Sequence, residues 1–142
     1  AAVIPRWVAE LLALRTPTIH GDGETTRDFC HIHNAVQANL LAACVDAEPQ
    51  DAVYNVAHGE RTSLNQLFSM LQEGVAEAVP DAALLRPSYG PFRAGDVRHS
   101  QADIGKIRRY LGYEPTVNVA EGLREALPWY VQNLPREAPV PA

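Results

Sequence analysis

Cysteine and methionine are both scarce in this sequence of 142 residues, which contains two cysteines, Cys30 and Cys44, and one methionine, Met70. Two cysteines on separate predicted elements make no disulfide framework, so we expect a reducing, cytoplasmic compartment. Because Met70 is the only methionine and the chain begins with alanine, we expect a segment of a longer protein.

An excess of basic residues and long apolar runs are lacking as well. Twelve Lys and Arg against 17 Asp and Glu give a net charge of −5. An acidic domain without a basic stripe is a poor nucleic-acid binder, so we expect no nucleic-acid partner. No apolar run approaches the roughly 20 residues that cross a bilayer. The first residues do not have the pattern of a signal sequence, and we expect no membrane partner.

Helical and extended patterns alternate along the chain, which favours an α/β fold. Apolar spacing predicts helices over 5–14, 34–45, 64–79, 102–111 and 119–134. Extended stretches are predicted at 18–20, 27–32, 52–57, 84–86 and 115–119, with 52–57 as a strand buried on both faces. One buried strand is too few for a doubly wound sheet, so we expect further structure in another segment. A domain at 1–134 is expected to precede a flexible, proline-rich tail at 135–142.

Spacing alone predicts no catalytic constellation. His31-x-His33 places two imidazoles on one face of a strand, but no third ligand follows at a recognised spacing, so ordinary histidines are favoured over a metal site. Gly21-Asp22-Gly23 is favoured as a plain turn over a phosphate loop, because the Gly-x-Gly-x-x-Gly spacing is missing. We therefore predict no catalytic, metal-binding or cofactor-binding residue in this chain.

Two segments that contain arginine are more informative. Arg27 follows the glycine turn, and the stretch from Arg93 to Ser100 combines cationic side chains with Asp96. The planar fork of arginine suits bidentate contacts to phosphate, and a carboxylate can accept hydrogen bonds from two ribose hydroxyls. Spacing leaves two interpretations open, a nucleotide-sugar site or surface arginines paired with Asp28 and Asp96, and on its own it favours the second.

Several motifs occur in order along the chain: Ala2-Val3-Ile4-Pro5-x-Trp7, the run from Gly21 to Phe29, Tyr54-Asn55-Val56-Ala57, the run from Arg93 to Asp103, Glu121-Gly122-Leu123 and Pro128-Trp129-Tyr130. Together they resemble the C-terminal part of nucleotide-sugar epimerases of the extended short-chain dehydrogenase/reductase (SDR) family. Within that family the sequence is most similar to UDP-N-acetylglucosamine 4-epimerases of bacterial polysaccharide synthesis. The resemblance covers residues 1–134. It implies the substrate-binding portion of a Rossmann-type α/β enzyme whose N-terminal NAD-binding half is missing.

The resemblance implies sugar and uracil contacts in the first part of the chain. Ala2 and Val3 match the segment that lies along the sugar and the diphosphate, and Trp7 matches an aromatic residue nearby. Thr18 and His20 match the extended segment whose backbone reads the uracil edge.

The resemblance also implies an anchor for the nucleotide. Arg27 and Arg93 match two arginines that hold the diphosphate, and Asp96 matches the carboxylate on the ribose hydroxyls. Ser100 matches the position that limits the sugar pocket, where a small residue admits an N-acetyl group. The implied ligand is therefore a UDP-N-acetylhexosamine.

The implied function is the UDP-sugar-binding part of an NAD-dependent UDP-N-acetylhexosamine 4-epimerase, an isomerase. The chain contains neither the glycine-rich dinucleotide motif nor a Tyr-x-x-x-Lys pair, so we expect no activity from it alone and no NAD bound to it. Its expected partners are the UDP-sugar and the missing N-terminal half, with self-association through an exposed apolar face. The alternatives are a stand-alone nucleotide-sugar-binding or structural module, and part of a related dehydratase, decarboxylase or reductase.

Overall fold

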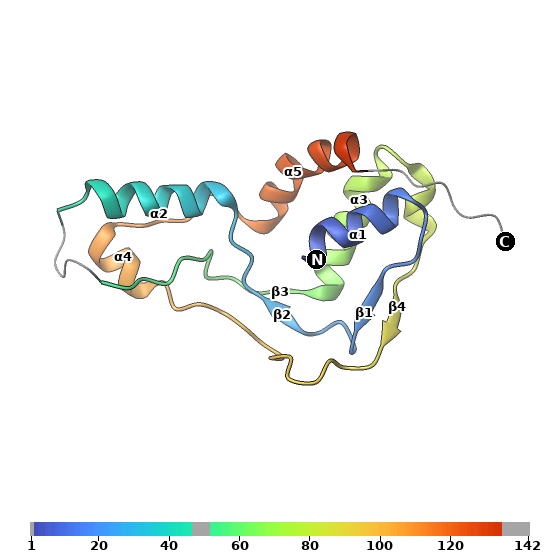
Figure 1. The fold of residues 1–142 in the computed structure, drawn as a ribbon, viewed down its shortest axis with the longest axis horizontal. Coiled ribbons are helices and arrows are strands. Elements are labelled where there is room, and N and C mark those ends of the chain that lie inside the picture. The colour runs from blue at the N-terminus through green and yellow to red at the C-terminus, as the bar shows by residue number, and fades with distance from the viewer. Residues whose placement is uncertain (1, 47–51, 135–142) are drawn as a thin grey trace. The chain divides into compact units, whose positions relative to one another are not determined.

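The computed structural model describes residues 2–46 and 52–134, and their Cα atoms group into two compact units (Figure 1). Unit 1 contains residues 2–25, 63–98 and 123–134. Unit 2 contains residues 26–46, 52–62 and 99–122. Helices and short strands alternate along the chain, so the predicted α/β class is confirmed. The predicted tail at 135–142 lies outside the described residues.

Unit 1 is built around helix α1 (Val3–Leu12) and helix α3 (Leu64–Ala76). Apolar residues at helical spacing on both helices are buried, and the rings of Trp7 and Phe68 meet edge to face with centroids 6.2 Å apart. Helix α5 (Val119–Asn133) lies so close to α3 that a Cβ on Gly74 would overlap the side chain of Leu127. Close packing of this kind defines the core of the unit.

A short parallel sheet continues unit 1. Strand β1 (Thr18–His20) pairs with strand β4 (Ser88–Gly90), which follows the 3-10 helix η1 (Pro80–Leu84). Ile19 in the middle of β1 is fully buried, whereas its neighbours on either side are half-buried. One face of β1 is therefore buried in the core through Ile19, and Thr18 and His20 lie on its other face.

Unit 2 packs helix α2 (Ile32–Cys44) against helix α4 (Gly105–Leu111). Ala38 of α2 meets an apolar cluster formed by Ala57, Ile104, Ile107, Leu111 and Tyr113. Two short strands, β2 (Thr26–Arg27) and β3 (Thr62–Ser63), pair with each other. Helix α4 ends as predicted at Gly112, whose φ of +65° is the left-handed value that favours glycine.

Three predicted extended stretches are wrong. The strand expected at 27–32 ends at Arg27, because the Asp28 carboxylate accepts backbone hydrogen bonds from other loops and Ile32 already begins α2. The stretch 52–57 pairs with no strand among the described residues, and Val53 is 85% exposed rather than buried. In the piece expected at 84–86, Leu84 ends η1 and Leu85 is extended, but the paired strand lies at Ser88–Gly90.

Candidate functional site

Strands β1 and β4 hold two of the predicted site residues in unit 1. Thr18 is in register with Ser88, and their hydroxyl oxygens lie 2.9 Å apart. Nδ1 of His20 lies 3.3 Å from the carbonyl oxygen of Pro91, the first residue after β4. The pairing therefore brings Thr18 and His20 to the start of residues 91–98, which we call the anchor loop.

The anchor loop contains two further predicted residues on a single turn. Its residues are exposed throughout. The Asp96 N–H donates to the carbonyl oxygen of Arg93 at 3.2 Å, and Gly95 between them has a φ of +77°. Arg93 and Asp96 thus lie on one solvent-exposed turn that begins beside β1. This arrangement can present a guanidinium and a carboxylate to the same ligand.

A second turn, residues 21–24, follows β1, and we call it the glycine turn. Gly21 and Gly23 have φ values of +85° and +79°. The ring of Phe92 occupies the space of a Cβ on Gly21, and the carboxamide of Asn65 occupies the space of a Cβ on Gly23. Side chains therefore fill the positions that a phosphate loop leaves open. The two positive φ values confirm the predicted glycine turn, and its preference over a phosphate loop stays a prediction.

Asn65 at the start of α3 organises the glycine turn. Its N–H donates to the carbonyl oxygen of Gly23 at 3.0 Å, and its Nδ2 donates to Oε1 of Glu24 at 2.7 Å. Its Oδ1 accepts the hydroxyl of Tyr89 at 3.0 Å. Sequence reasoning missed Asn65, because a polar residue in the first turn of a helix carries no signal of a distant loop contact.

An ion pair joins the far end of the anchor loop to the glycine turn. Nη2 of Arg98 lies 2.7 Å from Oδ2 of Asp22, and the guanidinium of Arg98 lies 5.5 Å from the centroid of the Phe92 ring. The hydrogen bond from Arg98 holds the pKa of Asp22 below its ordinary value, and the same bond raises the pKa of Arg98. Arg98 stands in a motif of the resemblance, but sequence reasoning assigned it no role.

Helix α1 places the remaining predicted residues of unit 1. Ala2 is the exposed N-cap, and Val3 is the half-buried first residue of the helix. Trp7 is only 1% exposed, and its ring packs on Phe68 in the core. Ala2 and Val3 are therefore the accessible members of this predicted group in the described chain.

Arg27 and Ser100 lie together in unit 2. The Ser100 N–H donates to the carbonyl oxygen of Thr26 at 3.2 Å, and the Thr26 hydroxyl lies 3.0 Å from Nδ1 of His99. Arg27 is half-buried, and its Nη1 donates to the carbonyl oxygen of Thr26 at 2.8 Å. These contacts place the exposed Ser100 beside the strand that carries Arg27.

The Asp28 carboxylate connects several backbone segments of unit 2, a role that the sequence did not indicate. It accepts hydrogen bonds from the backbone N–H groups of His58, Gly59 and Ala102 at 3.1 to 3.2 Å. A single carboxylate thereby joins β2 to two loops of unit 2. One of these loops follows Ser100, so Asp28 helps to fix the backbone near that predicted residue.

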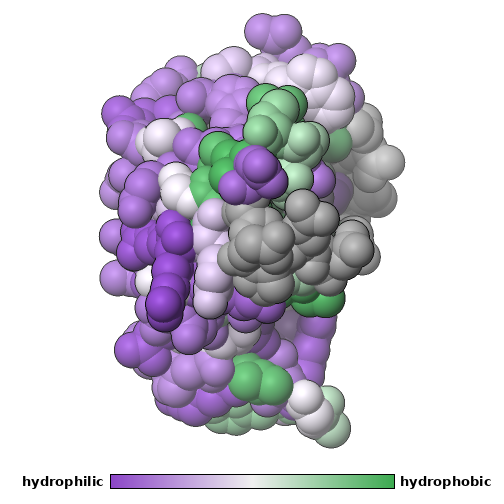
Figure 2. All heavy atoms as spheres, turned by 90° about the vertical axis from the view of Figure 1, so that its left-hand side faces the viewer, coloured by the Kyte–Doolittle hydropathy of each residue, from purple (hydrophilic) through white to green (hydrophobic). Residues whose placement is uncertain are grey.

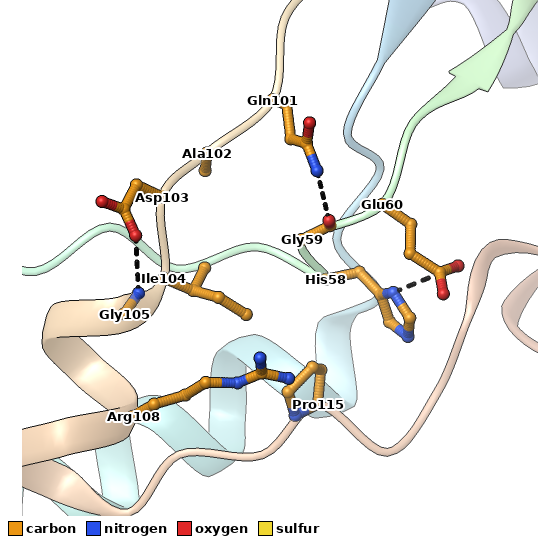
Figure 3. Close-up of a pocket in the computed structure, with 10 residues that line it drawn as sticks. All are labelled: His58, Gly59, Glu60, Gln101, Ala102, Asp103, Ile104, Gly105, Arg108 and Pro115. Carbon is orange, nitrogen blue, oxygen red and sulfur yellow. Dashed lines mark hydrogen bonds and ion pairs between the residues drawn. The ribbon is translucent and has the colours of Figure 1, made fainter.

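Unit 2 also has a cavity of about 690 Å³ with a mostly polar lining (Figure 3). Several of its polar groups are already paired. Nδ1 of His58 lies 3.5 Å from Oε2 of Glu60, and Oδ1 of Asp103 accepts the N–H of Gly105 at 2.8 Å. Arg108 completes one side of the cavity (Figure 3). None of the predicted site residues lines the cavity.

The histidine pair His31 and His33 and the two cysteines lie in unit 2, and the histidine pair is not on a strand as predicted. His31 caps α2 rather than lying on a strand, and its Nδ1 accepts the N–H of His33 at 3.4 Å. Cys30 and Cys44 are both free. Burial raises the pKa of the Cys30 thiol, which opposes formation of a nucleophilic thiolate.

The two motifs that the resemblance associates with NAD are both absent from this sequence. The sequence has no Gly-x-Gly-x-x-Gly motif and no lysine four residues after a tyrosine. Its one Gly-x-Gly turn, Gly21 to Gly23, is filled by Phe92 and Asn65 and precedes no helix directly.

In the part of the chain that the structure describes, no helix is both long enough and apolar enough to span a membrane.

Comparison with known proteins gives a family and a set of structural relatives. The family model described as GDP-mannose 4,6 dehydratase matches residues 1–126. UDP-glucose 4-epimerase of Thermotoga maritima, solved with UDP-glucose, superposes with a TM-score of 0.81 at 34% identity and covers 95% of this chain. UDP-N-acetylglucosamine 4-epimerase of Methanobrevibacter ruminantium, in complex with UDP-N-acetylmuramic acid, gives a TM-score of 0.79 at 32% identity over 93% of this chain.

A third structural relative was solved with both substrate and cofactor. UDP-glucuronic acid 4-epimerase of Bacillus cereus, in complex with UDP-glucuronic acid and NAD, has a TM-score of 0.74 at 27% identity over 92% of this chain. The chain spans 39 to 41% of the length of these three proteins.

Proposed function

This chain belongs to the GDP-mannose 4,6 dehydratase family of nucleotide-sugar epimerases and dehydratases, and from that premise we propose that it is the UDP-sugar-binding part of an NAD-dependent UDP-N-acetylhexosamine 4-epimerase. The observation that carries the proposal is the parallel pair β1–β4, which sets Thr18 and His20 at the start of the loop that presents Arg93 and Asp96.

The side chains of the anchor loop have the chemistry that a uridine diphosphate requires. Arg93 can donate a pair of parallel hydrogen bonds to phosphate oxygens, and Asp96 can accept the two hydroxyls of a ribose. The backbone of β1 at Thr18 and His20 is proposed to read the uracil edge. Arg27 is proposed as a second diphosphate ligand through the resemblance to the family.

The proposed sugar specificity depends on Ser100, with Ala2 and Val3 along the sugar and Trp7 as a buried support. Three relatives were solved with UDP-glucose, UDP-N-acetylmuramic acid and UDP-glucuronic acid, which supports a UDP-sugar as the class of ligand. The small side chain of Ser100 favours an N-acetylated sugar within that class.

NAD supplies the hydride chemistry of such an enzyme when it is bound. Because this chain has neither the glycine-rich dinucleotide motif nor a Tyr-x-x-x-Lys pair, we propose that another polypeptide segment holds the cofactor and that this chain alone has no epimerase activity. This chain is proposed to contribute affinity for the UDP-sugar and to orient it. The anchor loop holds the UDP group, and the sugar lies outside that loop.

Titration of UDP into the purified chain by isothermal calorimetry tests the anchor. We expect wild-type chain to bind UDP, and Arg93→Ala to weaken binding at least about tenfold, because a charge-assisted bidentate contact contributes more than a neutral hydrogen bond. Arg86→Ala is the matched control, since Arg86 is also an exposed arginine of unit 1. Equal affinity of the Arg93 and Arg86 variants would reject the proposed anchor.

Ser100→Tyr tests the proposed sugar preference in the same assay. Wild-type chain is compared with the variant for UDP-N-acetylglucosamine and UDP-glucose. We expect the tyrosine ring to lower the affinity for the N-acetylated sugar about tenfold and to change the affinity for UDP-glucose by less than about threefold, because added volume excludes the larger substituent. An equal loss for both ligands would contradict a role of Ser100 in limiting the pocket.

A further inference from the structure

We propose that Arg98 and Asp22 form a positioning pair for the nucleotide anchor, which holds the anchor loop on the glycine turn so that Arg93 and Asp96 are in place before UDP binds. The inference rests on the proposed function. It concerns residues outside the predicted binding set, and it assigns them an effect on UDP affinity without contact to UDP.

Both ends of the anchor loop are fixed to the same turn. At the start of the loop, the Phe92 ring packs on Gly21 so closely that even a methyl group there would overlap the ring. At the end of the loop, Nη2 of Arg98 lies 2.7 Å from Oδ2 of Asp22. Arg93 and Asp96 lie between these two contacts. A loop held at both ends loses less conformational entropy when a ligand orders its centre.

The glycine turn is itself held in place. Asn65 at the start of α3 donates to Glu24 and to the carbonyl oxygen of Asp22, at 2.7 and 3.2 Å. The Oδ1 of Asp22 accepts the N–H of Glu24 at 3.0 Å, which orients the carboxylate that meets Arg98. The pair therefore connects the anchor loop to a turn that is already fixed to a helix.

The geometry favours positioning over direct phosphate binding by Arg98. Nη2 of its guanidinium is paired with the Asp22 carboxylate, and its Cζ lies over the Phe92 ring, 5.5 Å from the ring centroid. Both partners of the pair are 47% exposed, so its effect on affinity is modest. We expect about a fivefold loss of UDP affinity when the pair is broken, which is the upper end of what an exposed ion pair contributes.

Two single variants separate positioning from a general effect of charge. Arg98→Gln and Asp22→Asn each break the pair, and we expect both to weaken UDP binding about fivefold by calorimetry. If Arg98 instead contacted phosphate, or if charge alone mattered, removing the Asp22 carboxylate would strengthen binding of the UDP anion. Arg86→Gln and Asp81→Asn are the matched controls, because both are exposed residues of unit 1. Tighter binding by Asp22→Asn would overturn the inference.

The reversed pair supplies a rescue test. The double variant Asp22→Arg with Arg98→Asp can restore the ion pair but not the bond from Asp22 to Glu24. We therefore expect it to recover part of the UDP affinity that the single variants lose. A double variant that binds more weakly than both single variants would overturn the inference.

Hydrogen exchange without ligand separates this inference from the proposed function. The Asp96 amide, which donates to the Arg93 carbonyl oxygen, reports whether the turn is held. We expect faster exchange of this amide in Arg98→Gln than in wild-type chain. If wild-type chain fails to bind UDP, the proposed binding function fails, and faster Asp96 exchange still supports the positioning pair. Unchanged exchange overturns the pair whatever the UDP result.

Discussion

Tyr113 shows at the scale of one residue how unit 2 buries polar groups together with their partners. Its side chain is fully buried, and its hydroxyl donates to the carbonyl oxygen of Ala57 at 2.8 Å. Burial raises the pKa of Tyr113 to about 12, and the nearby Cys30 adds to the shift. The neutral phenol is therefore the form that the folded state stabilises.

Tyr113→Phe removes the hydroxyl and leaves the Ala57 carbonyl without that donor. We expect the free energy of unfolding near pH 8 to fall by about 1–2 kcal/mol, the typical loss when a buried hydrogen bond is broken. Urea unfolding of the variant and of Tyr110→Phe, a matched control in unit 2, measures the difference. A loss no larger than that of Tyr110→Phe would contradict the role of the Tyr113 hydroxyl.

The same residue predicts a dependence of stability on alkaline pH. A pKa raised from 10.0 to about 12 on folding means that the contribution of Tyr113 is complete below pH 10 and is lost as the pH rises toward 12. We expect wild-type chain to lose stability over this range more steeply than Tyr113→Phe. Urea unfolding at several pH values between 9 and 12 tests this, and parallel curves for the two proteins would contradict it.

At the scale of elements, helices were predicted better than strands for a physical reason. The helices begin and end at local signals, such as Ser63 before α3 and Gly112 after α4. Their apolar spacing is also local, because it involves residues three and four positions apart. A strand needs a partner whose identity lies elsewhere in the chain. The apolar stretch 52–57 has the composition of a buried strand, yet it finds no neighbouring strand among the described residues.

The same limit applied to the candidate site. Motifs identified Arg93 and Asp96, and the structure places them on one exposed turn. Contacts between side chains distant in sequence, such as those of Asn65 and Asp28, were not predicted, because neither has a local pattern that indicates its partners. The predicted roles in UDP binding stay predictions until binding is measured.

The capping box of α3 gives a prediction at this scale. The Ser63 hydroxyl accepts the N–H of Gln66 at 3.1 Å, and Oε1 of Gln66 accepts the N–H of Ser63 at 2.8 Å. Ser63→Ala removes half of this reciprocal pair, and we expect a loss of about 1 kcal/mol in the free energy of unfolding. Ser69→Ala, at an exposed position of the same helix, is the control. Equal stability of the two variants would contradict the cap.

At the scale of the whole molecule, unit 2 exposes an apolar stripe along α2. Ile32, Val36 and Leu40 recur every four residues on one face, and Ile32 and Leu40 are 65% and 61% exposed. The opposite face, at Asn34 and Ala38, is buried. Figure 2 views the side on which α2 and α4 lie, where hydrophobic patches interrupt a largely hydrophilic surface. Exposed apolar side chains gathered on one helix face can mark an interface or drive association.

We therefore expect the purified chain to self-associate with increasing concentration, because burying the stripe removes apolar surface from water. The double variant Ile32→Lys with Leu40→Lys should shift the molar mass measured by light scattering toward a monomer, since lysine on the stripe opposes its burial. Leu84→Lys is the control, because Leu84 in unit 1 is also a highly exposed apolar residue, at 76%, but lies outside the stripe. A wild-type chain that remains monomeric at high concentration would show that the stripe alone does not drive association. An N-terminal nucleotide-binding segment that protects the α2 amides from hydrogen exchange would then identify the partner that covers it.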